Sequence, residues 1–79
     1  MEVTVEDKVN YWKNWIGIGS EWLTVEFESI AILVTDVVYC DDTDLIKVEY
    51  ISEDNPHSIN FSSVAQFVDG RFIRNYRDQ

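Results

Sequence analysis

Cysteine and histidine are almost absent from this sequence, which has only Cys40 and His57. One cysteine cannot form a disulfide within the chain, and a structural zinc site needs four cysteine or histidine ligands. The sequence therefore predicts a protein without a bound metal or other cofactor. The lack of a cysteine pair is also typical of a reducing compartment, so we expect a cytoplasmic protein.

Long apolar runs and basic residues are also scarce. No apolar run reaches the roughly 18 residues that span a bilayer, and the segment MEVTVED is acidic where a signal peptide is basic. We therefore expect a soluble protein that does not bind membranes. Six Lys and Arg against fifteen Asp and Glu give a net charge of −9. This charge argues against direct binding to nucleic acid and favours a basic protein surface as the partner.

The residues that build a hydrophobic core are abundant. The chain is 46% hydrophobic and 14% aromatic, so its 79 residues can form one small domain. Residues 1–54 hold thirteen acids against three lysines, a net charge of −10, whereas residues 55–79 have a net charge of +1. We predict a single domain in which residues 1–19 form a helix and its connection, and residues 20–79 form a β-barrel-like core.

Residues 5–15 are predicted to form a short helix. Four apolar residues recur at spacings of four, three and four and so share one helical stripe: Val5, Val9, Trp12 and Ile16. Thr4 followed by Asp7 is a variant of the capping box, and Gly17 or Gly19 can end the helix. A strand through EVTVE, which alternates with period two, is the alternative.

From Glu21 onward, the alternation of side chains and the β-branched runs predict strands. The predicted strands are EWLTVEF, SIAILVTDVVY, DLIKVEYI, SINF and RFIRNY. Residues 40–44, CDDTD, are predicted to be a hairpin loop, and SEDNPHS is predicted to be a turn. Ser62 is the predicted N-cap of a short helical turn that ends at Gly70.

This order of elements predicts a mainly β fold of the α+β kind. We expect a small five-stranded SH3-like barrel or a strongly bent antiparallel sheet, with an N-terminal helix and a helical turn before the last strand. The segments GSEW, VTDVVYCDDTDLIKVEYI and FSSVAQFVDGRFIRNY resemble small SH3-like barrel domains of phage and mobile-element proteins of unknown role. The resemblance covers residues 17–77, and if the protein is phage-encoded, as such domains are in phages, we expect it to act in the host cytoplasm. The resemblance implies no catalytic residue.

The sequence contains no motif of an enzyme. Asp41, Asp42 and Asp44 are spaced loosely as in a calcium loop, but the glycine of such a loop and its distant bidentate Glu are missing. Cys40 and His57 fall at a predicted strand end and in a predicted turn, where a half-buried thiol and a surface imidazole explain them without nucleophilic catalysis. We therefore predict that the protein is not an enzyme.

Two functions remain as hypotheses. In the first, the protein is a phage-encoded inhibitor that binds a basic surface of a host nucleic-acid-binding protein by imitating nucleic acid. The candidate carboxylates lie on the predicted hairpin and the next turn, with support from Glu21, Glu26 and Glu28: Asp36, Asp41, Asp42, Asp44, Glu49, Glu53 and Asp54. The alternative explanation of these acids is that they only keep the protein soluble.

In the second hypothesis, the protein is an SH3- or Tudor-like adaptor that binds a peptide or modified residue in an aromatic groove. The groove would be formed by Tyr11, Trp12, Trp15 and Trp22. Tyr11 and Trp15 lie on the flank of the predicted helix, off its buried stripe, and are candidate partner-binding residues. The alternative is that these aromatics are core. A homodimer through open strand edges or exposed aromatics is a further hypothesis.

Overall fold

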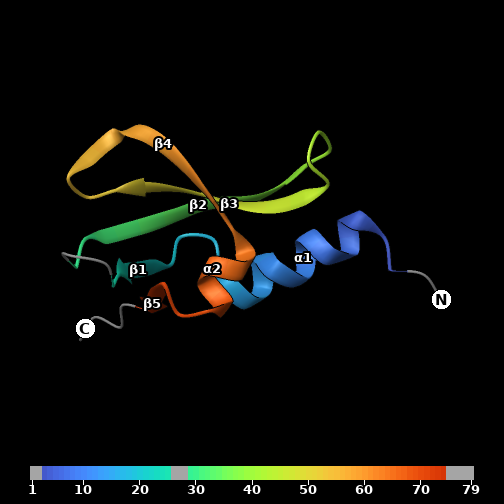
Figure 1. The fold of residues 1–79 in the computed structure, drawn as a ribbon, viewed down its shortest axis with the longest axis horizontal. Helices are drawn as coiled ribbons and strands as arrows, with labels where there is room; N and C mark the ends of the chain where they lie inside the picture. The colour runs from blue at the N-terminus through green and yellow to red at the C-terminus, as the bar shows by residue number, and fades with distance from the viewer. Residues whose placement is uncertain (1–2, 26–28, 75–79) are drawn as a thin grey trace.

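The structure, a computed structural model, describes residues 3–25 and 29–74 (Figure 1). The elements in chain order are α1 (Val5–Ile16), β1 (Glu21–Thr24), β2 (Ala31–Cys40), β3 (Leu45–Ser52), β4 (Asn55–Ser63), α2 (Val64–Val68) and β5 (Phe72–Arg74). The five strands form one antiparallel sheet in the order β4-β3-β2-β1-β5. The predicted mainly β fold is confirmed, as an open sheet that is not closed into a barrel.

Helix α1 begins and ends where its local sequence predicts. The Thr4 side chain accepts a hydrogen bond from Asp7 N (3.1 Å), and the Asp7 carboxylate accepts one from Thr4 N (3.3 Å). This reciprocal pair satisfies two backbone donors that the first turn leaves open. Gly17 follows the helix with a φ of 87°, a conformation that side chains with a Cβ rarely adopt. The predicted helix is therefore confirmed and is one residue longer than expected.

Strands β2 and β3 form a long hairpin with one irregularity. The pairing shifts between Val34 and Asp36, which leaves Thr35 as an extra residue in β2. Such a bulge bends the strand and increases its twist. The last pairs of the hairpin, Tyr39 with Ile46 and Cys40 with Leu45, lie beyond the ends of both neighbouring strands. The loop of the hairpin therefore projects from the sheet (Figure 1).

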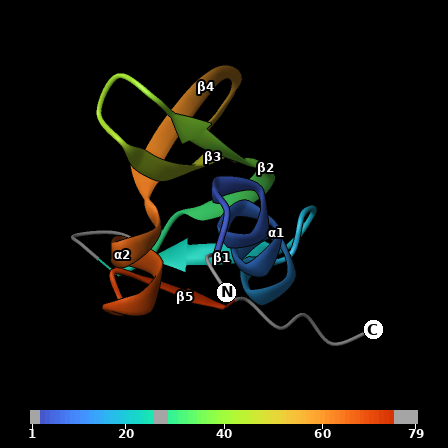
Figure 2. The ribbon, with the colours of Figure 1, turned by 90° about the vertical axis from the view of Figure 1, so that its right-hand side faces the viewer.

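The hydrophobic core lies between the two helices and one face of the sheet (Figure 2). Its buried members are Ile16, Trp22, Ile32, Val34, Val37, Val48, Phe67 and Phe72. Val9 and Trp12 pack against them from the predicted stripe of α1, whereas Val5 at the start of the helix is exposed. Each aliphatic or aromatic side chain buried in this way contributes about 1.5–3 kcal/mol.

Ser20 connects the end of α1 to the sheet. Its buried hydroxyl donates a hydrogen bond to Gly17 O (2.6 Å) and accepts one from Trp22 Nε1 (2.8 Å). Arg74 of β5 donates through Nη1 to Ile16 O (3.0 Å). These bonds satisfy polar groups that the helix end would otherwise leave without partners.

The turn predicted for SEDNPHS is shorter than expected. Strand β4 begins at Asn55, so Pro56 and His57 lie in the strand rather than in the turn. The reason is an irregular pairing, because Ser52 pairs with Asn55 while its neighbour Ile51 pairs with Ile59. Residues 56–58 are thereby pushed away from β3, and a proline is tolerated there because β4 is an edge strand.

The start of α2 also differs by one residue from the prediction. The N-cap is Ser63, and its side chain forms no capping hydrogen bond. The predicted cap, Ser62, is buried at the end of β4, where its hydroxyl bonds to the Gln66 side chain. Gly70 lies just beyond the helix with a φ of 88°, in agreement with its predicted role as the stop.

Candidate functional site

The predicted acidic residues lie in three separate places. Asp41, Asp42 and Asp44 lie in the loop of the β2–β3 hairpin, and Glu53 and Asp54 form the β3–β4 turn. These two groups lie at opposite ends of the long axis of the molecule, with β3 between them (Figure 1).

The remaining two carboxylates, of Asp36 and Glu49, lie between these ends in the hairpin strands. The structure therefore divides the predicted acidic surface instead of gathering it on one patch. The supporting residues Glu26 and Glu28 lie outside the described residues.

We call residues 41–44 the hairpin tip. All four residues are exposed, and the pair of Cys40 with Leu45 closes the loop. Asp44 has a φ of 54°, which is a left-handed conformation that Asp tolerates better than most residues. The backbone conformation at position 44 therefore favours Asp over most other residues, independently of its charge.

The charges of the hairpin tip act on Tyr39, at the end of β2. Its hydroxyl donates a hydrogen bond to Asp44 Oδ1 (2.5 Å). This bond, followed by desolvation and by the negative charges of Asp44 and Asp41, raises the pKa of Tyr39 above its ordinary value of 10.0. Tyr39 was not among the predicted site residues, although the predicted hairpin already places it across the loop from Asp44.

No described cation neutralises the hairpin tip. The ion pair that the structure contains in residues 3–25 and 29–74 joins Lys13 to Asp36, and none of the three tip aspartates lies within 4.0 Å of a Lys or Arg nitrogen there. Within residues 3–25 and 29–74, these exposed carboxylates are therefore balanced by solvent ions and not by a side chain. They are free to form charge-assisted hydrogen bonds with a partner.

Asp36 and Glu49 are engaged within the fold. Asp36 Oδ1 lies 3.8 Å from Lys13 Nζ of α1 and accepts a hydrogen bond from Val37 N (2.8 Å). Glu49 Oε2 accepts a hydrogen bond from the hydroxyl of Thr35, the bulge residue, at 2.6 Å. The exposed ion pair between Lys13 and Asp36 contributes at most about 1 kcal/mol to the stability of the fold. Both carboxylates therefore help to shape the hairpin, and they are less available to a partner than those of the tip.

Glu53 and Asp54 are exposed in the turn at the other end. The Asp54 carboxylate accepts a hydrogen bond from the Ser52 hydroxyl, and Glu53 N donates to Ala31 O (2.9 Å). Glu53 also lines a shallow hollow of about 180 Å³ whose other walls include Leu33 and Ile51. This end of the molecule thus combines two carboxylates with apolar surface.

The four N-terminal aromatics are partly core and partly surface. They form a chain of ring contacts from Tyr11 to Trp12 (5.0 Å), Trp15 (5.7 Å) and Trp22 (6.4 Å), and Trp22 continues to Phe67 in the core. Trp22 is 6% exposed, whereas Tyr11 is 58% and Trp15 is 47% exposed. The Arg74 guanidinium lies 5.6 Å from the Trp22 ring centroid. Three surface hollows formed by described residues, lined among others by Glu53, Arg71 and Asn55, do not include any of these aromatics in their walls.

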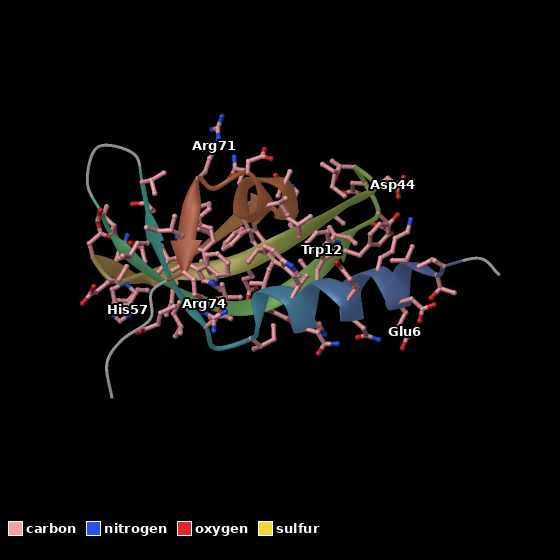
Figure 3. The ribbon with its side chains drawn as sticks, turned by 90° about the horizontal axis from the view of Figure 1, so that it is seen from below. Glu6, Trp12, Asp44, His57, Arg71 and Arg74 are labelled. Carbon is pink, nitrogen blue, oxygen red and sulfur yellow. The ribbon has the colours of Figure 1, made fainter. Side chains whose placement is uncertain are left out.

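Other indications of function are few in the described part of the chain. Cys40 adjoins the hairpin tip that Asp44 marks in Figure 3, while His57 lies at the opposite end of the molecule. No described group of three His, Cys, Asp or Glu residues comes together as metal ligands, and no described helix is long and apolar enough to cross a membrane.

Comparison of the chain with known protein families, curated proteins and solved structures gives no match.

Proposed function

We propose that the protein is an acidic protein-binding module that presents its hairpin tip to a basic surface of another protein. The observation that carries this proposal is the projecting loop with three aspartates in four residues, none of which pairs with a described cation. The net charge of −9 supports it, because a field of one sign attracts an oppositely charged partner and accelerates association.

The hairpin holds these carboxylates in a defined arrangement. The β2–β3 pairing continues to Cys40 and Leu45, directly next to the tip, and the hydrogen bond from Tyr39 fixes the Asp44 side chain. A group that is already ordered loses less conformational entropy when it binds. The tip is therefore suited to recognition by fixed carboxylates rather than by a flexible acidic tail.

The partner would be a protein surface lined with Lys and Arg. A nucleic-acid-binding groove has this property, because its basic side chains bind phosphates, and carboxylates can occupy the same positions. The inhibitor role, the host partner and the phage origin belong to this proposal. The net acidity also opposes binding of the protein to nucleic acid itself.

The proposal is tested by comparing two variants that have the same net charge but carry the substitutions at different places on the molecule. One variant carries Asp41→Lys, Asp42→Lys and Asp44→Lys, and a control of equal net charge carries Glu53→Lys, Asp54→Lys and Asp69→Lys. We expect the tip variant to bind a fluorescent arginine-rich peptide at least about tenfold more weakly, and the control to lose about threefold or less. Equal losses in both variants would show that only net charge matters and would reject the hairpin tip as the site.

The adaptor function is a second candidate because Tyr11 and Trp15 are about half exposed on α1. Aromatic side chains with exposed rings are frequent hot spots of protein interfaces. In this case Trp15→Ala would abolish binding of a partner, and the triple substitution at the tip would leave it nearly unchanged. The two variants therefore distinguish the two candidates once a protein partner is in hand.

A further inference from the structure

The outer edge of β4 differs from the rest of this acidic chain. Asn55–Ser63 contains no Asp, Glu, Lys or Arg, although 27% of the sequence is charged. β4 is the last strand on its side of the sheet, and it lies at the rim of the molecule in both views (Figures 1 and 2). Edge strands are usually protected by charged residues, proline or bulges. Here Pro56 and the irregular pairing of residues 56–58 protect only the start of the strand.

The unprotected part of this edge carries exposed apolar side chains. From Ile59 to Ser63 the pairing with β3 is regular, so every other residue directs its backbone N–H and C=O groups outward. Ile59 is 61% and Phe61 is 52% exposed. Both lie on the face opposite the core, because Asn60 between them pairs with Tyr50, which packs against the core.

The polarity of the segment is symmetric about Asn60. Ser58–Ile59–Asn60–Phe61–Ser62 has the same pattern in both directions. If two such strands pair antiparallel with Asn60 opposite Asn60, each Ile59 faces a Phe61 and each Ser58 faces a Ser62. The four apolar side chains then gather on one face and the polar side chains on the other, which is the favourable arrangement of cross-strand pairs.

We infer that β4 pairs with β4 of a second copy of this chain across a two-fold axis, which joins the two sheets into one. A two-fold interface needs a self-complementary surface, and this edge provides one in both hydrogen bonding and side-chain polarity.

Charge favours the same contact. In this register the start of one β4, next to its acidic β3–β4 turn, lies opposite the end of the other β4, next to the uncharged helix α2, and not opposite another acidic turn. Two strongly acidic molecules can therefore meet at this edge without placing these carboxylates against each other.

The first experiment measures the oligomeric state of the full chain by sedimentation equilibrium over a wide concentration range. We expect a reversible dimer for the wild-type chain and a monomer for Ile59→Lys and Phe61→Lys. Ile73→Lys is the matched control, because Ile73 is 49% exposed on β5 at the opposite edge of the sheet. Circular dichroism verifies that each variant is folded. A wild-type chain that stays monomeric, or a control that dissociates as the β4 variants do, would overturn the inference.

The second experiment tests the register in a Cys40→Ser background. Asn60→Cys should form a disulfide-linked dimer on mild oxidation, because the two introduced thiols face each other across the axis. Ser58→Cys should not, since each Ser58 is expected to face Ser62 and the two positions 58 lie about 13 Å apart along the strands. Faster cross-linking at position 58 than at position 60 would contradict the proposed pairing. The inference does not depend on the binding of a basic partner by the hairpin tip.

Discussion

The hairpin tip and the β4 edge belong to one sheet but have opposite surface chemistry. The tip has three carboxylates in four residues, and the β4 edge has no charged residue in nine. A charged loop acts over several ångströms and weakens as salt screens it, whereas an apolar edge acts only in direct contact through packing and backbone hydrogen bonds. If both proposals hold, recognition of a basic partner and contact between copies of the chain take place on separate surfaces of one sheet.

Both surfaces depend on the same core, and removing its central aromatic residue should have the largest effect. Trp22 is 6% exposed, contacts Phe67 (4.9 Å between ring centroids) and donates a hydrogen bond to Ser20. We expect Trp22→Ala to lower the free energy of unfolding by about 3–5 kcal/mol, because it leaves a large cavity and removes the hydrogen bond that the buried Ser20 hydroxyl accepts. Urea unfolding followed by circular dichroism measures this loss.

The control is Trp15→Ala, because Trp15 contacts Trp22 in the same ring chain but is 47% exposed. Its loss should stay below about 1.5 kcal/mol, since nearly half of the side chain is already in water. Equal losses for the two variants would show that Trp15 contributes to the core as much as Trp22 does and would weaken the case for Trp15 as an interface residue.

Added salt should have opposite effects on binding at the hairpin tip and on dimerisation through β4. When sodium chloride is raised well above physiological strength, we expect binding of an arginine-rich peptide to weaken by about tenfold, because opposite charges are screened. The β4 dimer should become tighter by a few-fold, since screening reduces repulsion between two acidic chains. Titrations of fluorescence anisotropy and sedimentation equilibrium at matched salt concentrations measure the two responses. If dimerisation also weakened with salt, the contact between copies would involve charges that β4 does not contain.

The ends of α1 and the β2–β3 hairpin could be predicted from the residues that lie next to them in the sequence. The bonds between Thr4 and Asp7 fixed the start of α1, and Gly17 fixed its end. The alternation on both sides of CDDTD predicted the β2–β3 hairpin, whose strands and loop the structure contains. In each case the signal and the structure that it specifies lie within a few residues of each other.

The distribution of the carboxylates over the surface could not be predicted in the same way. Asp44 and Glu53 are close in sequence, but the eight residues of β3 between them span roughly 26 Å, which places them at opposite ends of the sheet. The bulge at Thr35 and the engagement of Glu49 depend on pairing between strands. Likewise, the symmetry of Ser58–Ser62 becomes meaningful only once the strand order shows that β4 is an edge.

The smallest expected effect concerns the electrostatic field of the hairpin tip alone. Because Asp44 accepts the hydrogen bond of Tyr39, Asp44→Asn should lower the pKa of Tyr39 toward 10.0, and an Asn is tolerated at the left-handed φ of this position. Glu53→Gln, at the other end of the sheet, should leave this pKa unchanged. Ultraviolet titration of each variant, with Tyr39→Phe to identify the signal among the tyrosines, measures the shift.

The same pKa shift gives the sign of a stability effect. The pKa of Tyr39 is higher in the folded than in the unfolded chain, so its contribution to stability is fully present below pH 10 and is lost as the pH rises through the folded pKa. In Asp44→Asn, the free energy of unfolding that is lost as the pH rises through the pKa of Tyr39 should therefore be smaller. Substitutions at the β4 edge should leave this loss unchanged. If Asp44→Asn left the Tyr39 titration unchanged, the tip carboxylates would not be held as the structure places them, and a flexible acidic loop would replace the ordered tip as the partner-binding element.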